Sequence, residues 1–162
     1  MELRPEKRRE SFTTENDTRG APSFGQTLTE NGKKAAPVSS KLAQWPCKLG
    51  LAPENAPYFD GADILLAADC TAYAYAGFHT DFMKNRITLV ACPRLGAVDV
   101  YERLLAILRN NKIGSLTLVR MEVGCCDALE KAARRAILDS GSAVRLEVVT
   151  VGTCGRILEG IV

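Results

Sequence analysis

Five of the six cysteines in this chain of 162 residues lie at or just after the end of an apolar run. Cys70 ends the run ILLAADC, Cys92 ends ITLVAC, Cys125 and Cys126 end LTLVRMEVGCC, and Cys154 follows LEVVTV. Thiolate sulfur is a soft ligand that selects zinc or an iron–sulfur cluster over magnesium or calcium. We therefore predict a thiolate metal site made of Cys70, Cys92, Cys125 and Cys126.

Residues near these cysteines are further candidates for the site. His79, the only histidine, follows Cys70 closely enough to act as a ligand or as a hydrogen-bond donor to cluster sulfur. Glu122 is a candidate hydrogen-bond acceptor, and Cys154 is a candidate additional ligand. The adjacent cysteine pair begins a predicted helix, where the macrodipole and free N–H groups favour the thiolate form. Because successive side chains diverge, we expect one of the pair to be a spare ligand or a redox partner.

The elements that position these residues alternate between strands and helices. Near-continuous apolar runs of strand length cover residues 62–69, 87–92, 115–123 and 144–151. The turn GTCG then leads into a final short strand, RILEGIV, which predicts a hairpin. Strands that are apolar on both faces and alternate with helices indicate a parallel sheet that helices cover on each side. The predicted fold is a three-layer α/β domain of Rossmann-like type with a mostly parallel sheet.

Two long helices and one short helix are predicted between the strands. In residues 98–111, three leucines and a valine share one helical face, Asp99 is suited to cap the start, and two asparagines are suited to end it. Residues 126–141 have an acidic first turn, a Glu130–Arg134 pair and a glycine at the C-cap position. Residues 71–83, TAYAYAGFHTDFM, have aromatic and alanine spacing that allows a short helix.

This topology explains how cysteines far apart in the sequence can form one site. Right-handed crossovers make the parallel strands point the same way, so their carboxyl ends open on one edge of the sheet. Folds of this kind bind ligands at that edge. Taken singly, a cysteine at the end of a buried strand is typical of a packed small hydrophobe. Four strand ends that all carry a cysteine favour a site, whereas Cys47, in a different context, is interpreted as structural.

The composition indicates one globular domain without a polyanionic partner. The formal net charge is +2, so we expect neither nucleic acid nor a membrane as partner. Residues 1–43 are polar and lack apolar periodicity, which predicts a disordered charged tail before a single domain at 44–162. No apolar segment follows the charged start, and no run approaches the ~20 apolar residues that span a membrane. We therefore expect a cytoplasmic protein with reduced thiols.

Several other kinds of cysteine or phosphate site fail on spacing. No cysteine is followed by the arginine of a C-x5-R phosphatase loop, and neither G-x-x-x-x-G-K nor G-x-G-x-x-G is present. The zinc deaminase pattern, H-x-E with P-C-x-x-C, is also absent from the sequence. A catalytic nucleophile made of Cys70 or Cys126 with His79 as its base is compatible with the composition, but no sequence motif supports it.

The segment WPCKLGLAPENAPYFDGADILLAADCTAYAYAGFHTDFMKNRITLVACPRL, with MEVGCC and VGTCGRIL, resembles the C-terminal domain of iron–sulfur-binding, ferredoxin-type proteins of anaerobic bacteria and archaea. The resemblance covers about residues 44–160 and depends on the AADC, FHTDF, ACP and MEVGCC blocks in combination. The family's motif cysteines fall on Cys70, Cys92, Cys125 and Cys126, and His79 lies in the FHTDF block. Cys47 and Cys154 stand where that family has other residues.

The chain departs from that family at its other end. A 4Fe-4S ferredoxin module with two clusters usually precedes the domain in the family, whereas no cysteine precedes Cys47 here. The C-x2-C-x2-C-x3-C runs that hold ferredoxin clusters are therefore missing. The resemblance leaves three interpretations of the missing module: a stand-alone version of the domain, a split gene product whose ferredoxin acts in trans, or a degenerate relative of the family. The second of these implies a ferredoxin or other redox protein as partner.

These observations lead to one hypothesis and two alternatives from other classes. The leading hypothesis is that the protein is a component of redox metabolism that binds an iron–sulfur cluster. A 4Fe-4S cluster is favoured, and zinc is the alternative metal. The first alternative is a metal-free α/β module that binds a partner protein, with its cysteines merely packed. The second is a thiol-based redox enzyme in which one cysteine of the pair attacks an electrophile or cycles through a disulfide.

Overall fold

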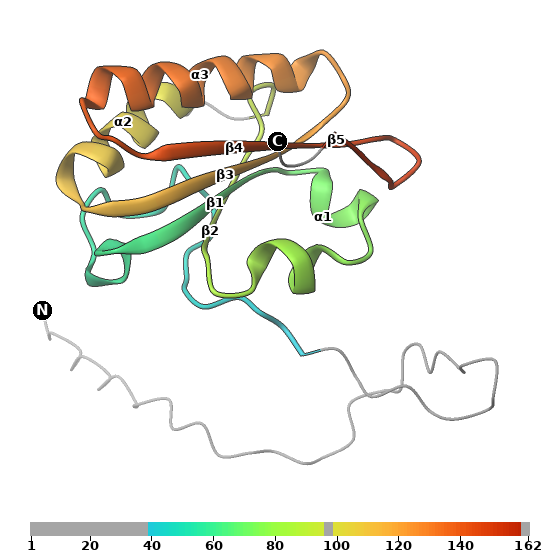
Figure 1. Cartoon of the computed structure of the whole chain (residues 1–162), viewed down its shortest axis with the longest axis horizontal. Helices are drawn as coiled ribbons and strands as arrows, with labels where there is room; N and C mark the ends of the chain where they lie inside the picture. Colours follow the sequence, from blue (N-terminus) through green and yellow to red (C-terminus); the bar gives the residue numbers. More distant parts are fainter. Residues whose placement is uncertain (1–38, 96–98, 160–162) are drawn as a thin grey trace, which may run out of the picture. The chain divides into compact units, whose positions relative to one another are not determined.

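The computed structural model of the chain describes residues 39–95 and 99–159 (Figure 1). These residues belong to one structural unit, Ser39–Val162. Most of the predicted disordered tail, residues 1–43, lies outside the described residues. Residues 39–43 are described and lie in neither a helix nor a strand.

One mixed sheet of five strands runs through the middle of the unit, in the order β2-β1-β3-β4-β5 (Figure 1). The first four strands are parallel, and β5 pairs antiparallel with β4 as the predicted hairpin. Both faces of β1 and β3 are covered, so these strands are buried over most of their length and have continuous apolar sequences. The strands are Ala62–Ala68 (β1), Ile87–Ala91 (β2), Ile113–Met121 (β3), Arg145–Val151 (β4) and Ile157–Glu159 (β5).

Helices cover both faces of the sheet. The helices α2 (Val100–Asn110) and α3 (Cys125–Ser140) pack against each other on one face, while α1 (Thr71–Ala74) and the π-helical turn η2 (His79–Met83) lie on the other (Figure 1). A short 3-10 turn, η1 (Pro57–Phe59), precedes β1. The chain steps outward from β1 to β2 and then back across β1 to β3, so right-handed crossovers put the two connections on opposite faces. The predicted three-layer α/β fold is confirmed.

The predicted short helix over residues 71–83 is instead two separate turns, α1 and η2. The chain leaves the helical conformation at Tyr75, whose φ of −105° and ψ of 112° are extended. The Tyr75 hydroxyl donates a hydrogen bond to Asp81 Oδ2 at 2.5 Å, and its ring lies 5.4 Å from that of Phe82. These contacts bridge the break, so the interruption depends on tertiary packing that helical spacing does not report.

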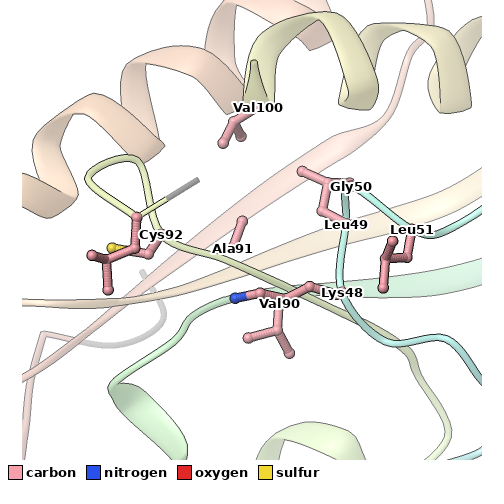
Figure 2. Close-up of a pocket in the computed structure, with 9 residues that line it drawn as sticks. Lys48, Leu49, Gly50, Leu51, Val90, Ala91, Cys92 and Val100 are labelled. Carbon is pink, nitrogen blue, oxygen red and sulfur yellow. The ribbon is translucent and has the colours of Figure 1, made fainter. Parts of the chain in front are cut away.

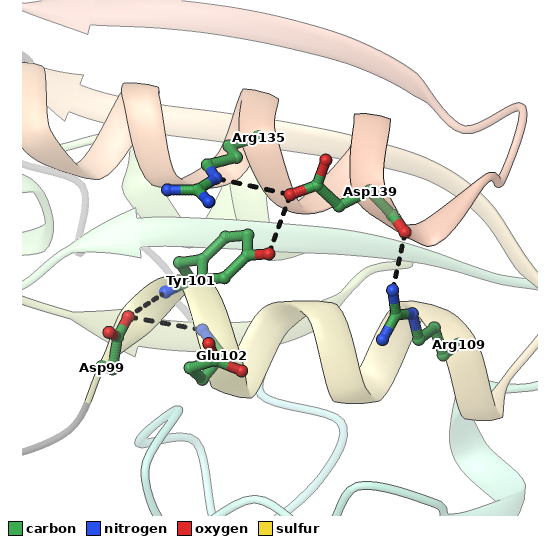
Figure 3. A network of polar contacts seen from close by, with 6 residues as sticks. All are labelled: Asp99, Tyr101, Glu102, Arg109, Arg135 and Asp139. Carbon is green, nitrogen blue, oxygen red and sulfur yellow. Dashed lines mark hydrogen bonds and ion pairs between the residues drawn. The ribbon is translucent and has the colours of Figure 1, made fainter.

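The start and the buried face of α2 follow the sequence prediction. The carboxylate of Asp99 accepts hydrogen bonds from the backbone N–H groups of Tyr101 at 2.9 Å and Glu102 at 3.3 Å (Figure 3). This is the N-cap interaction that satisfies otherwise free donors of the first turn. The predicted apolar face is buried against the sheet and α3, and Ile107 joins it; its other members are Val100, Leu104, Leu105 and Leu108.

Polar contacts join the exposed sides of α2 and α3. The Tyr101 hydroxyl donates to Asp139 Oδ2 at 2.8 Å, and this hydrogen bond raises the pKa of the phenol (Figure 3). The guanidinium of Arg135 lies 4.6 Å from the centre of the Tyr101 ring, a cation–π distance. Arg109 donates to the backbone oxygen of Asp139 at 2.9 Å. The two helices are therefore held in register at their surface as well as through their apolar faces.

The features predicted for α3 are also present. Asp127 lies in the first turn, and Glu130 forms an ion pair with Arg134 at 2.8 Å, one turn apart. The helix ends at Gly141, which has a φ of 69° in the left-handed region and donates its N–H to the Leu138 oxygen.

The outer edge of β2 is covered by the segment 44–49. The side-chain amide of Gln44 donates to the Thr88 oxygen at 2.5 Å and accepts from the Thr88 N–H at 3.3 Å. The next outward-facing residue, Val90, donates to the Cys47 oxygen at 2.8 Å and accepts from the Leu49 N–H at 3.0 Å. The segment therefore serves in part as an additional strand beside β2, and this places Cys47 along the edge strand.

Candidate functional site

The predicted site cysteines all lie at the carboxyl edge of the parallel sheet. Cys92 directly follows β2, Cys70 lies between β1 and α1, and Cys125 and Cys126 are the first residues of α3 after β3. Cys154 lies in the turn between β4 and β5. Along the edge, the order of strands places Cys92 first, then Cys70, then the Cys125–Cys126 pair, and Cys154 last.

The strand order also locates the crevice where such a fold binds ligands. The connection after β1 leads to β2 on one side, whereas β3 lies on the other side of β1. A topological switch point lies between two neighbouring strands whose following connections run in opposite directions along the sheet. Ligands bind beside such a point, at the carboxyl ends of the strands. Cys70 and Cys125 flank this switch point, one in each of the two loops that border it.

The thiols are spread along this edge. Neighbouring strands lie ~4.8 Å apart, so Cys92 and Cys154, three strands apart, are separated by roughly 14 Å across the sheet. Cys70, Cys125 and Cys154 are exposed, Cys92 is half-buried, Cys126 is buried, and no described cysteine forms a disulfide. Within residues 39–95 and 99–159, no three histidine, cysteine or acidic side chains lie close enough together to hold a metal ion.

The two adjacent cysteines differ sharply in environment. The Cys126 thiol is buried at the start of α3, whereas the thiol of its neighbour Cys125 is exposed. Burial raises the pKa of Cys126, and the Cys125 thiol acts in the same direction, while a backbone hydrogen bond from Met121 and the charge of Arg120 oppose the change. The expected preference for thiolate at this helix start is therefore outweighed by burial at Cys126.

Glu122 anchors the β4–β5 turn to the end of β3. Its Oε1 accepts hydrogen bonds from the Thr153 N–H at 2.6 Å and from the Thr153 hydroxyl at 2.9 Å. The backbone hydrogen bond is the larger of the two causes that lower the pKa of Glu122. At Gly155 the same turn touches α1, since a Cβ on that residue would lie 2.5 Å from the Ala74 oxygen. The turn that carries Cys154 therefore bridges the loops after β1 and β3.

His79 is held by the segment that precedes the sheet. Its Nδ1 accepts a hydrogen bond from the Lys41 N–H at 3.2 Å, so this nitrogen already has a backbone partner. His79 begins η2, on the face of the sheet that α1 also covers. Only the other ring nitrogen, Nε2, is then left to act as the predicted ligand or donor.

Two ion-pair groups beside the cysteines were not found from the sequence. Asp69, next to Cys70, forms an ion pair of 2.5 Å with Lys48, which lies 21 positions earlier in the chain. No local pattern marks this partner. Arg120 near the end of β3 pairs with Asp127 at 2.9 Å and with Glu130 at 2.8 Å. A single arginine inside an apolar strand run is the signal that indicates the second group, because a largely buried charge needs a partner.

Comparisons with known proteins place this fold in a family. Residues 56–161 match the Rossmann-like domain family. The chain is similar to an uncharacterized protein of Archaeoglobus fulgidus, with 28% identity over 118 residues that cover 72% of this chain and 83% of the relative. No solved structure matches the chain. In the described part of the chain, no helix has the length and apolarity to cross a membrane. The match over most of the sheet and its helices shows that the chain belongs to the Rossmann-like domain family.

Proposed function

We propose that this protein binds an iron–sulfur cluster, or a zinc ion in its place, through thiolates at the carboxyl edge of the sheet. The ligands are drawn from Cys70, Cys92, Cys125 and Cys126. The observation that carries the proposal is that three adjacent parallel strands, β2, β1 and β3, are each followed by cysteine at the edge where this fold binds ligands.

The donor set fits a soft metal centre. Every proposed ligand is a thiol, and thiolates select zinc and iron–sulfur clusters. Cys70 and Cys125 flank the switch point and are exposed, so an incoming metal ion can reach both sulfurs. Cys126 is buried, and that burial raises its pKa. It is therefore the candidate ligand whose thiol gives up its proton least readily. Since the thiols are spread along the edge, binding requires the loops after the strands to draw together.

The sequence resemblance to ferredoxin-type proteins of anaerobes supports iron over zinc, and 4Fe-4S over other clusters. Such a centre supplies one-electron transfer when bound. The protein then serves redox metabolism as an electron-transfer component, and a ferredoxin or other redox protein supplied in trans exchanges electrons with it. A reducing cytoplasmic compartment keeps the thiols available for this role.

The test is metal analysis of protein purified without oxygen. Iron, zinc and acid-labile sulfide are measured with a visible spectrum on the unaltered chain and on the variants Cys70→Ser, Cys92→Ala and Cys125→Ser. Cys47→Ser is the matched control, because Cys47 lies in the segment beside the edge strand and not in a loop that follows a parallel strand. We expect metal in the unaltered chain and the control and loss of metal in the three site variants. Protein that stays metal-free after reconstitution would contradict the proposal.

A second function is supported by the different exposure of the adjacent residues Cys125 and Cys126. An exposed thiol next to a buried one suits two-electron chemistry, in which the exposed sulfur attacks a substrate disulfide and the buried sulfur resolves the mixed disulfide. Both substrate sulfurs leave as thiols, and the pair becomes a disulfide. Adjacent Cα atoms lie ~3.8 Å apart, below the ~4.4 Å minimum of ordinary disulfides, so this bond is strained and easily reduced. This second function is tested by treating metal-free protein with oxidised glutathione and titrating the remaining thiols. We expect the loss of two thiols.

A further inference from the structure

A cavity of about 210 Å³ opens at the carboxyl end of β2, next to Cys92 (Figure 2). The segment that precedes β1 forms one wall, the end of β2 forms the floor, and the first residue of α2 forms the roof. The side chains that matter for its chemistry are Leu49, Leu51, Val90, Cys92, Leu95 and Val100.

The cavity has a buried apolar interior and an exposed apolar mouth. Leu49 and Val100 are 1% and 7% exposed, whereas Leu51 and Leu95 are each 71% exposed. Single exposed leucines are ordinary on a protein surface, but here two of them border the same apolar hollow. A ligand in the hollow would remove apolar surface of both leucines from water, which is the dominant favourable term in such binding.

The charge at the wall is already neutralised. Lys48 lines the cavity, but its ammonium pairs with Asp69 Oδ2 at 2.5 Å. A charged ligand would have to compete with this pair, whereas a neutral ligand leaves it intact. The remaining polar side chain in the lining is the Cys92 thiol, and a free cysteine behaves largely as a small hydrophobe.

The volume limits the size of the ligand. A protein cavity of ~150 Å³ lined by leucine, isoleucine and phenylalanine binds benzene. The cavity beside Cys92 is larger, at about 210 Å³, and it is open to solvent on one side, so it has room for a ring with a short substituent. The cavity lies at the carboxyl edge of the sheet, one strand away from the switch point beside which this fold binds ligands.

We propose that this cavity is a binding site for a small neutral apolar molecule, of the size of a benzene ring with a short alkyl substituent. This inference is independent of the proposed metal centre, with which it shares only Cys92. Binding is therefore measured on metal-free full-length protein, so that failure of one proposal is distinguishable from failure of the other.

The test is a titration with ethylbenzene followed by NMR of the leucine, isoleucine and valine methyl groups. We expect saturable shifts of the Leu49, Val90 and Val100 methyls, with no shift at Val151 on β4 or Leu129 on α3. Ethanol, added over the same concentrations, is the polar control and should shift none of them. Absence of saturable shifts up to the solubility limit of ethylbenzene would overturn the proposal, and so would shifts that grow linearly at all methyls alike.

Cysteine reactivity gives a second reading that needs no variant. Ethylbenzene should slow alkylation of Cys92 by iodoacetamide severalfold, while the exposed Cys154 in the same molecule reacts at an unchanged rate. Mass spectrometry of the two peptides reports both rates in one experiment. If the cavity methyls shift with protein concentration alone, and ethylbenzene does not reverse this, the occupant is a second copy of the chain and the proposal is wrong.

Discussion

Replacement of Gly155 by alanine tests whether the β4–β5 turn is fixed against α1. Gly155 has a φ of +76°, and a Cβ added there would lie 2.5 Å from the Ala74 oxygen. Carbon does not approach a backbone oxygen so closely without movement. The turn or α1 must therefore shift, and α1 directly follows Cys70.

Two contributions set the expected loss of stability. An L-residue in the left-handed region costs about 1–2 kcal/mol relative to glycine. Forcing extra atoms into a well-packed contact costs about 1–3 kcal/mol more. Gly141→Ala is the matched control, because Gly141 has a φ of +69° and open space around its added Cβ. Only the first contribution applies to the control, so the two variants should differ by about 1–3 kcal/mol.

Urea unfolding of the two variants, followed by far-UV circular dichroism, measures this difference. The alkylation rate of Cys70 in native conditions gives a second readout, which should change in Gly155→Ala and stay constant in Gly141→Ala. Equal losses of stability in the two variants would show that the turn does not rest on α1. The β4–β5 turn would then not bridge the loops after β1 and β3.

Three further predictions concern the elements around the site. Asp99→Ala should lower the free energy of unfolding by about 1 kcal/mol, because two N–H groups of α2 lose their acceptor; Asp99→Ser should restore most of it, and equal urea midpoints for all three proteins would contradict this. Leu104→Ala should cost about 2–5 kcal/mol because the side chain is fully buried, whereas Leu138→Ala, at 78% exposure, should change the urea midpoint little. Glu122→Gln tests a pH dependence. The folded pKa of Glu122 is lowered, so its contribution is present above the unfolded value near 4.5 and is lost as pH falls through the lower folded value. The difference in urea midpoint between the unaltered chain and Glu122→Gln should therefore shrink in acid, and a difference independent of pH would contradict it.

Periodicity in the sequence predicted the sheet and both long helices because burial is what creates that periodicity. Leu104 and Leu108 recur one turn apart and both are buried, and Asp99 caps α2 as expected. The placement of the site cysteines at one edge followed in the same way, from strand ends and the handedness of crossovers. These features depend on local spacing or on general rules of topology.

The features that the sequence did not predict depend on contacts between distant residues. The break between α1 and η2 is stabilised by the contact of Tyr75 with Asp81, which helical spacing does not encode. The partner of Asp69 is Lys48, which lies 21 positions earlier in the chain, where no local pattern indicates the contact. The burial that raises the pKa of Cys126 likewise comes from the packing of α3 on the sheet.

The segment beside β2 has a consequence for how this protein meets other chains. An edge strand with free N–H and C=O groups is a template on which a strand of another molecule can add. At Thr88 and Val90 all four outward groups are hydrogen-bonded, two of them to the side-chain amide of Gln44. The carboxamide of Gln44 thus makes the hydrogen bonds that a peptide group of a neighbouring strand would make, and it protects the β2 edge from intermolecular strand addition and aggregation.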